Sequence, residues 1–479
     1  MSFPALRLGT TMRKLILPTF IAVLLLTGPA NAAEASKPSA GDSRIDLGDL
    51  PLPKAKNKAK SQANANANDN TNLANLEQDA PELSLLTGPN NDESSVSGLI
   101  ITGAGNPLPE TGLTRPPFHL RTKSNAPIGI DYLTPEIVTH FYGISAMQNN
   151  QQGAGQTIAI IDAYHNPNIA DDLNVFSQQW GLPLCNAANP CFKQAYASGK
   201  QPAADKGWSV EIALDVEWAH AIAPRANILL VEADSNSLDD LFKAVDYAVK
   251  NGANVVSMSF GGAEFQTENF YDFHFDVPNV IFTASSGDNG DGVEYPAASP
   301  YVIAVGGTSI NTDPTGAYLG ETGWSGSGGG LSAFETAQAF QQKFTGEDAQ
   351  NMRGVPDVAY GADPQVGYYI YDSFNAPGWI RIGGTSAGAP QWAALIAIGN
   401  SMRNAAAATL QDGSAVQAAN IMLYHAALNL SAYPSYYHDI TSGGNGACGF
   451  VCTAESGYDY VTGLGSPIAN KLLGYLSGN

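Results

Sequence analysis

Charge, and basic charge above all, is scarce in this chain of 479 residues. Lys and Arg number 23 against 44 Asp and Glu, which leaves a formal net charge of −21, and only 14% of the residues are charged. Because binding to phosphates requires Lys and Arg, this shortage argues against nucleic acid as a partner. The 44% of apolar residues is enough to bury a sizeable core, so a wholly disordered chain is excluded. An acidic, weakly charged chain suits an exported protein that works in acid.

Apolar runs long enough to span a membrane are also missing. The best candidate, residues 15–26, is short and is interrupted by Pro18. It follows basic residues, of which Lys14 is the last, and it precedes a small-x-small site at residues 30–32. These features predict a signal peptide over residues 1–32, with an uncleaved anchor as the alternative. We therefore expect a secreted protein, extracellular or periplasmic, without stable membrane insertion once the signal is removed.

Residues 33–115 lack the periodicity of packed helices and strands. Residues 54–72 are a low-complexity tract of Lys, Ala and Asn, with Pro, Gly and Asp scattered around it. Such a composition buries little apolar surface, so we predict a propeptide or a linker here. The chain changes character near residue 116, and residues 116–479 are predicted to form the folded domain.

Cysteines are few, and the four present form two close pairs, Cys185 with Cys191 and Cys448 with Cys452. In an exported protein such pairs predict local disulfides. A zinc site is the alternative, but the spacings differ from those of zinc ribbons and no His is adjacent to either pair in the sequence.

Strand-like apolar runs alternate with helical patterns in the predicted domain. Strands are predicted at residues 157–161, 228–231, 255–259, 280–284 and 302–305, and helices at residues 209–222 and 238–249. Strands separated by helix-length segments imply βαβ units, and hence an α/β fold with a doubly wound, mostly parallel sheet flanked by helices. In such sheets the functional residues gather at the carboxyl ends of the strands.

Ser386 lies in a run of small residues, 383–390, which precedes an apolar stretch that starts at Trp392. The small residues allow a substrate backbone to approach closely, and Pro390 fits a helix only within its first turn. This pattern places Ser386 where a helix begins, with its hydroxyl exposed beside free backbone N–H groups. The alternative is a serine that caps the helix in a glycine-rich loop.

Glu211 and Asp215 are one helical turn apart, so their carboxylates lie on the same face of the predicted helix. Like charges at this spacing destabilise a helix, and the neighbouring residues are mostly apolar. We therefore expect a partly buried pair in which one carboxyl stays protonated and hydrogen-bonds the other. The alternative is a solvated acidic stripe.

Asp288 lies in a tight loop, residues 285–290, directly after a predicted strand. Taken alone it is a turn residue. A serine nucleophile, however, needs a general base, and none of the seven histidines is in a His-Gly-Thr type setting. A carboxylate such as Glu211 replaces histidine at acidic pH, where histidine would be protonated. Under the same condition Asp288 is protonated and donates a hydrogen bond to an oxyanion.

In their order along the chain, these motifs resemble those of the sedolisins, the serine-carboxyl peptidase family with a subtilisin-like fold. The resemblance covers roughly Tyr132 to the C-terminus, and the ordered set is far more specific than any single motif. It rests on Glu211-x-x-x-Asp215, Ser285-Ser286-Gly287-Asp288 and Gly384-Thr385-Ser386-Ala387-x-Ala389-Pro390, with support from residues 304–308 and 324–330.

The resemblance implies a catalytic domain over residues 116–479 that hydrolyses peptide bonds at acidic pH through an acyl-enzyme on Ser386. Glu211 would be the general base, Asp215 would orient it and Asp288 would donate to the oxyanion. We expect a secreted endopeptidase that acts on protein or peptide substrates as a monomer. A tripeptidyl exopeptidase on the same scaffold and a catalytically inactive, calcium-stabilised binding module are the alternatives.

The resemblance also implies one Ca²⁺ ion in a C-terminal loop region. The side chains of Asp439 and Asp459 and the backbone carbonyls of Ile440, Glu455 and Gly457 would bind it, and such hard oxygen ligands suit Ca²⁺. Relatives often have Gly where Glu455 stands. The alternative is a cluster of turns without a metal.

Three further positions bear on the resemblance. Asp162, after the predicted strand 157–161, extends the carboxyl network in some relatives, and a strand-end turn residue is the alternative. Phe260 stands where some relatives have Trp near that network. The segment before the domain is shorter than the folded inhibitory propeptide usual in the family, so we expect folding and inhibition of the zymogen to work differently.

Overall fold

The computed structural model describes residues 112–120, 130–147, 152–313, 316–345, 349–375, 378–403 and 415–477. The predicted signal peptide and residues 33–111 of the predicted propeptide or linker lie outside the described residues. Residues 112–115 are described and lie against the folded domain, where Arg115 pairs with Gly261. Among the helices of the described ranges, none combines the length and the apolar character needed to cross a membrane.

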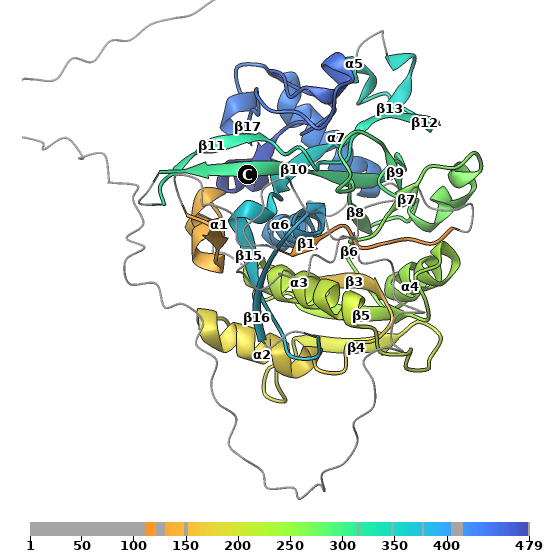
Figure 1. Cartoon of the computed structure of the whole chain (residues 1–479), viewed down its shortest axis with the longest axis vertical. Helices are drawn as coiled ribbons and strands as arrows, with labels where there is room; N and C mark the ends of the chain where they lie inside the picture. Colours follow the sequence, from red (N-terminus) through yellow and green to blue (C-terminus); the bar gives the residue numbers. More distant parts are fainter. Residues whose placement is uncertain are drawn as a thin grey trace, which may run out of the picture. The chain divides into compact units, whose positions relative to one another are not determined.

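The centre of the fold is a mostly parallel sheet (Figure 1). Its strands are β3 (Thr157–Ala163), β4 (Phe192–Tyr196), β5 (Asn227–Ala233), β6 (Val255–Met258), β8 (Ile281–Ser285), β10 (Val302–Thr312), β11 (Tyr318–Gly323) and β14 (Val358–Gly361). They are arranged in the order β11-β10-β8-β6-β3-β5-β4, with β14 also paired to β10. Only the pair β10–β11 is antiparallel.

Helices cover both faces of this sheet. α3 (Lys206–Ile222) and α6 (Gly388–Met402) pack on one face and α4 (Leu238–Lys250) packs on the other. The other helices of the described ranges are α1 (Pro135–Phe141), α2 (Ile169–Trp180), α5 (Gln342–Thr345), α7 (Ala415–Leu428) and α8 (Ala469–Leu476). Successive side chains of β3 point to opposite faces. Ile158 and Ile160 pack into the core that contains α3 and α6, whereas Ala159 and Ile161 pack into the core that contains α4. Both faces are therefore buried, which confirms the predicted doubly wound α/β fold.

A second sheet stands beside the first. Its strands are β1 (His119–Leu120), β16 (Gly378–Gly383), β15 (Gly367–Asp372) and β2 (Tyr132–Leu133), in that order. The remaining strands form pairs: β7 (Gly262–Ala263) with β9 (Glu294–Tyr295), β12 (Gly330–Thr336) with β13 (Met352–Val355), and β17 (Tyr437–His438) with β18 (Ser466–Pro467). Because β16 leads directly into the turn before α6, this sheet positions the run of small residues that contains Ser386.

Several element boundaries differ from the sequence predictions. α3 begins at Lys206, before the predicted start, because the Asp205 side chain accepts a hydrogen bond from the Trp208 N–H and caps the helix. β10 continues to Thr312 because its second half pairs with β11. β4 was not predicted, since its sequence mixes polar and apolar residues without a clear period. Each difference reflects a partner that is distant in the sequence or a cap outside the apolar pattern.

Candidate active site

Ser386 lies in a single 3₁₀ turn, Thr385–Ala387, between β16 and α6. Gly384 before it has φ +132°, and a Cβ there would collide with the Pro117 carbonyl and with the Asp288 carboxyl. Pro390 lies in the first turn of α6, as predicted. The N-cap of α6 is Ala387 without a side-chain hydrogen bond, so the alternative of a capping serine is wrong. The buried Ser386 hydroxyl has no hydrogen-bond partner among the described residues.

Glu211 and Asp215 project from α3, which packs against the turn that holds Ser386. Both carboxyl groups are fully buried, so the alternative of a solvated acidic stripe is wrong. The expected hydrogen bond between them is absent from the described structure. Side chains one turn apart leave a helix in nearly parallel directions, which keeps the two carboxyl groups side by side rather than head to head.

Burial and repulsion from neighbouring acids raise the pKa of both carboxyl groups well above their usual values. For Glu211 burial is the largest cause and the charge of Asp162 is the next, while the nearby Ser386 and Ser259 hydroxyls lower its pKa. For Asp215 the causes are burial and then the charge of Glu211, again opposed by Ser259. The Ser386 hydroxyl therefore lies beside the Glu211 carboxyl, and the Ser259 hydroxyl lies near both acids.

Ser259 was not predicted as a site residue. It follows β6, and its hydroxyl lies 3.4 Å from the Ser386 carbonyl oxygen. The only hint in the sequence is its place at the carboxyl end of a predicted strand. Phe260 next to it is fully buried among apolar side chains and offers no hydrogen-bond donor to the acids.

Asp162 is not a strand-end turn residue, because it lies within β3 and pairs with Glu232 of β5. It is fully buried, and burial followed by the charges of Asp215 and Glu232 raises its pKa well above the usual value. The prediction that it follows a strand is wrong, since pairing with β5 extends β3 to Ala163. Asp162 is thus a third buried acid next to Glu211 and Asp215.

Asp288, in the loop that follows β8, lies against the turn that contains Ser386. Its Oδ1 accepts hydrogen bonds from the backbone N–H and from the hydroxyl of Thr385, both at 2.8 Å. Burial raises the pKa of Asp288 well above its usual value, although the two Thr385 bonds oppose this effect. The alternative of a plain turn residue does not explain a buried carboxyl that is held against the turn containing Ser386.

Glu294, in β9, is a further acid that the sequence analysis missed. Its carboxyl lies so close to the backbone of Gly261 and Gly287 that a Cβ at either glycine would collide with it. Burial raises the pKa of Glu294 to about 7, and the Asn289 side-chain amide opposes this effect. Gly261 and Gly287, which belong to different loops, let the Glu294 carboxyl come this close. Local sequence patterns do not show that these two loops are neighbours in the fold.

The structure thus brings Ser386, Glu211, Asp215 and Asp288 to one buried place at the carboxyl ends of β6 and β8. A model of the Subtilase family matches residues 195–427, which include all four. Kumamolisin from Bacillus sp. (strain MN-32) is 32% identical over 392 residues, which are 74% of this chain and 65% of that protein. The chain belongs to the sedolisin family. Sedolisin from Pseudomonas sp. (strain 101), a second relative, is 28% identical over 71% of this chain and 61% of its own length.

A solved sedolisin structure agrees with this assignment. Pseudomonas sedolisin, described as a serine-carboxyl proteinase complexed with two molecules of pseudo-iodotyrostatin, superposes with a TM-score of 0.62. It is 27% identical, and the match covers 73% of this chain and 99% of that one. The subtilisin-like fold expected from the resemblance is thereby confirmed. The chain spans less than two-thirds of the length of the sedolisin-family proteins kumamolisin and sedolisin, at 65% and 61%.

Three of the residues predicted to bind calcium, Asp439, Gly457 and Asp459, lie around the Tyr433 hydroxyl. The Tyr433 hydroxyl lies 3.2 Å from Asp439 Oδ1 and 3.3 Å from the Gly457 carbonyl oxygen. Burial, and then the charges of Asp439 and Asp459, raise the pKa of Tyr433. Burial raises the pKa of Asp459 to about 7. Within the described part of the chain neither aspartate forms an ion pair with Lys or Arg, so the donor set fits a hard cation.

The other two predicted calcium ligands are the carbonyls of Ile440 and Glu455, which belong to the same loops. Ile440 comes directly after Asp439, and the Glu455 N–H donates a hydrogen bond of 3.3 Å to Asp459 Oδ2. The roles of the Ile440 and Glu455 carbonyls stay predictions.

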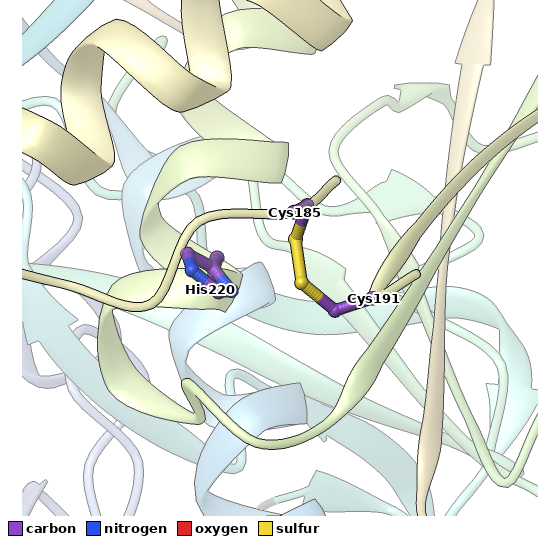
Figure 2. Close-up of side chains that lie close together, drawn as sticks. All are labelled: Cys185, Cys191 and His220. Atoms are coloured by element: carbon purple, nitrogen blue, oxygen red, sulfur yellow. A yellow bond between two sulfur atoms is a disulfide. The ribbon is translucent and has the colours of Figure 1, made fainter. Parts of the chain in front are cut away.

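Disulfides join Cys185 to Cys191 and Cys448 to Cys452, which confirms the predicted pairing. His220 of α3 lies beside the first pair, although it is distant in the sequence (Figure 2). Its Nε2 lies 2.8 Å from the Pro183 carbonyl oxygen, and burial lowers its pKa. The alternative of a zinc site does not agree with this structure, since the sulfur atoms are bonded to each other and are not free thiolates.

Proposed function

We propose that this chain is an exported serine-carboxyl endopeptidase that hydrolyses peptide bonds at acidic pH through an acyl-enzyme on Ser386. The observation that carries the proposal is that the Ser386 hydroxyl lies beside a buried glutamate, Glu211, in a turn that a buried aspartate, Asp288, contacts. Export is supported by the signal-like residues 1–32. The similarity to a solved sedolisin that is described as a serine-carboxyl proteinase supports the peptidase activity.

Glu211 would take the Ser386 proton as the hydroxyl attacks the peptide carbonyl carbon. A raised pKa makes Glu211 a stronger base than an ordinary glutamate, which suits proton transfer from a hydroxyl. Only its ionised form accepts the proton, so protonation of Glu211 would limit the rate on the acid side. Asp215 and Asp162 would hold this base in place and share its proton, since their charges and that of Glu211 raise one another's pKa. Glu211 would then return the proton to the leaving amine.

Asp288 would stabilise the oxyanion as a neutral acid. Its Oδ1 is occupied by the two donors of Thr385, whereas its Oδ2 accepts no hydrogen bond from the described residues and is available to carry a proton. Below its raised pKa the group is protonated and donates, and the donor is lost as the pH rises through that pKa. We therefore propose that deprotonation of Asp288 ends the activity on the alkaline side of the pH profile.

Hydrolysis of a mixed peptide library at pH 3–8, with mass analysis of the products, tests this function. We expect internal cleavage of N-terminally blocked and unblocked peptides alike, with a maximum in acid and a loss of rate toward neutral pH. Some relatives carry the name tripeptidyl-peptidase, such as Tripeptidyl-peptidase 1 of Dictyostelium discoideum, at 27% identity. Release of tripeptides from unblocked peptides alone would favour that exopeptidase activity. No cleavage at any pH would favour the inactive binding module.

We also propose that Asp439, Asp459 and the Gly457 carbonyl, with the carbonyls of Ile440 and Glu455, bind one Ca²⁺ ion. The ion would neutralise two carboxylates that have no basic partner in the described structure, and it would fix the loops around β17 and β18. Its role would be structural, because the proposed catalytic steps use only Ser386 and the buried acids.

Calcium removal is expected to destabilise the protein at pH 5–6. Chelation of the full chain should lower its Tm by several degrees, and added Ca²⁺ should restore it, because a bound ion stabilises the folded state by mass action. Asp439→Asn should abolish this calcium-dependent rise, whereas Asp276→Asn, at an exposed position, should retain it. The same Tm with and without Ca²⁺ in the unsubstituted chain would contradict the site.

A further inference from the structure

Residues 112–120 cross the proposed active site and turn at Pro117 (Figure 1, orange). Ahead of Ser386, Leu113 pairs with Ser237 and Arg115 pairs with Gly261, both antiparallel. Arg115 and Gly261 exchange two backbone hydrogen bonds, with N to O distances of 3.2 and 3.3 Å. Beyond Ser386, His119 and Leu120 pair antiparallel with β16. The segment is therefore held by backbone hydrogen bonds on both sides of the serine, as a bound peptide substrate would be.

The register of this segment places one peptide group at Ser386. The Ser386 backbone N–H points to the Pro117 carbonyl oxygen, with 3.4 Å between nitrogen and oxygen. A Cβ at Gly384 would collide with this oxygen and with Asp288 Oδ2, so the oxygen lies next to the Asp288 carboxyl. A backbone N–H of the nucleophile and a second donor are the two groups that surround the scissile carbonyl in acyl transfer.

The side chains of the segment fit its surroundings on both sides of this carbonyl. Pro116, Pro117 and Phe118 are buried. The His119 ring lies edge-on to the Trp324 ring with 5.8 Å between the centroids, and its Nε2 lies 3.5 Å from Asp288 Oδ2. The Thr114 N–H and hydroxyl both donate to the Asn236 carbonyl, at 2.8 and 3.0 Å. These contacts hold the segment in one register at Ser386.

We propose that the peptide bond between Pro117 and Phe118 is the self-processing site of this chain, so that the mature protein begins at Phe118. The proposal rests on the function proposed above. Until the bond is cleaved, residues 112–117 occupy the place of a substrate. After cleavage, Phe118 stays buried and β1 stays paired with β16, whereas the segment that ends at Pro117 is free to dissociate.

The cleavage is an ordinary hydrolysis. Ser386 Oγ forms a bond to the Pro117 carbonyl carbon, and the bond from that carbon to the Phe118 nitrogen breaks. The hydroxyl proton passes through Glu211 to the Phe118 nitrogen, which leaves as an amine. Water then hydrolyses the Pro117 ester, which restores the Ser386 hydroxyl and leaves a carboxyl group on Pro117.

Two features slow the cleavage of this bond, so that activation is delayed. The Phe118 N–H donates a 3.2 Å hydrogen bond to the Pro116 carbonyl, so the chain turns at Pro117 instead of extending fully. Two consecutive prolines restrict the backbone movements that would straighten it. Attack on the Pro117 carbonyl requires that this turn open, which delays processing relative to cleavage of a flexible substrate.

N-terminal sequencing and intact-mass analysis of the full chain, purified at neutral pH and then acidified, test the proposal. We expect a product that begins at Phe118 to accumulate together with activity on an N-blocked peptide. Ser386→Ala should remain uncleaved at this bond. Pro117→Ala should be processed at the same bond and several-fold faster. Leu113→Ala, a matched change at an exposed side chain of the same segment, should give the same N-terminus at the rate of the unsubstituted chain.

The possible failures are distinguishable. An active protein that cleaves the external peptide but begins at a residue other than Phe118 would overturn the processing site and leave the proposed function intact. An unsubstituted chain that cleaves neither itself nor the external peptide would overturn both. Cleavage between Pro117 and Phe118 in purified Ser386→Ala would show that another protease acts there, which overturns self-processing.

Discussion

Replacing Ser386 with alanine is expected to lower kcat on an N-blocked peptide at acidic pH by on the order of 10⁵-fold, the scale at which a serine peptidase loses its nucleophile. The reason is structural: no other described hydroxyl combines a neighbouring carboxyl base, Glu211, with a carbonyl-binding N–H and Asp288. The substitution removes one buried oxygen that has no hydrogen-bond partner in the described structure, so the fold should be retained. Steady-state kinetics and thermal unfolding of the same preparations measure both effects.

Ser401→Ala is the matched control for this change. Ser401 is on the same helix, α6, and its hydroxyl donates a 2.7 Å hydrogen bond to the Ile398 carbonyl, far along the helix from the turn at Ser386. Its kcat should stay within about twofold of the unsubstituted chain, since surface serine changes have small effects. Peptidase activity of purified Ser386→Ala near that of Ser401→Ala would contradict the role of Ser386.

A rise in pH from 4 to 8 is expected to lower the folding stability of this protein. Burial raises the pKa of a set of carboxyl groups well above the usual values, and the set consists of Asp162, Glu211, Asp215, Glu217 and Asp288. A raised folded-state pKa means that the native state holds its proton more tightly than the unfolded chain does. The stability from these groups is complete below the unfolded-state pKa, near 4, and is lost as the pH rises through the folded-state values.

The contributions of these groups to the loss all have the same sign. Each unit of difference between folded and unfolded pKa is about 1.4 kcal/mol, and a domain is stable by only about 5–15 kcal/mol. Thermal unfolding of the full-length Ser386→Ala chain, which avoids self-digestion, should give a Tm that falls steadily between pH 4 and pH 8. A Tm that is highest near pH 8 would show that these acids are stabilised as anions, against the prediction.

Glu217→Gln separates this effect from catalysis. Glu217 lies on α3 outside the proposed site, where its Oε2 accepts the Tyr371 N–H at 3.0 Å and the charges of Asp172 and Asp372 add to burial in raising its pKa. Glutamine keeps an acceptor for Tyr371 but carries no proton to lose, so the fall of Tm with pH should become less steep. Asp276→Asn, at an exposed position, should leave the slope unchanged.

Much of the fold could be predicted from the sequence because its elements are defined by local patterns. The alternation of apolar strands with helices indicated the parallel sheet, and the helix over Leu238–Lys250 was predicted to within one residue because its apolar face repeats regularly. The cysteine pairs are so close in sequence that local disulfides were the natural prediction. The ordered motifs around Glu211, Asp288 and Ser386 indicated the family for the same reason, since each motif is contiguous.

The sequence by itself therefore determined the class of the fold, the family and the residues that carry the motifs. Only the tertiary structure decided that Asp162 is a buried strand residue beside Asp215, that Ser259 lies near both acids of α3, and that Glu294 lies against Gly261 and Gly287. It also decided that Pro117, in a segment predicted to begin the domain, faces Ser386. The physical reason is that burial, pKa and the distance between two side chains depend on packing between segments far apart in the chain, whereas a motif records only the order of neighbouring residues.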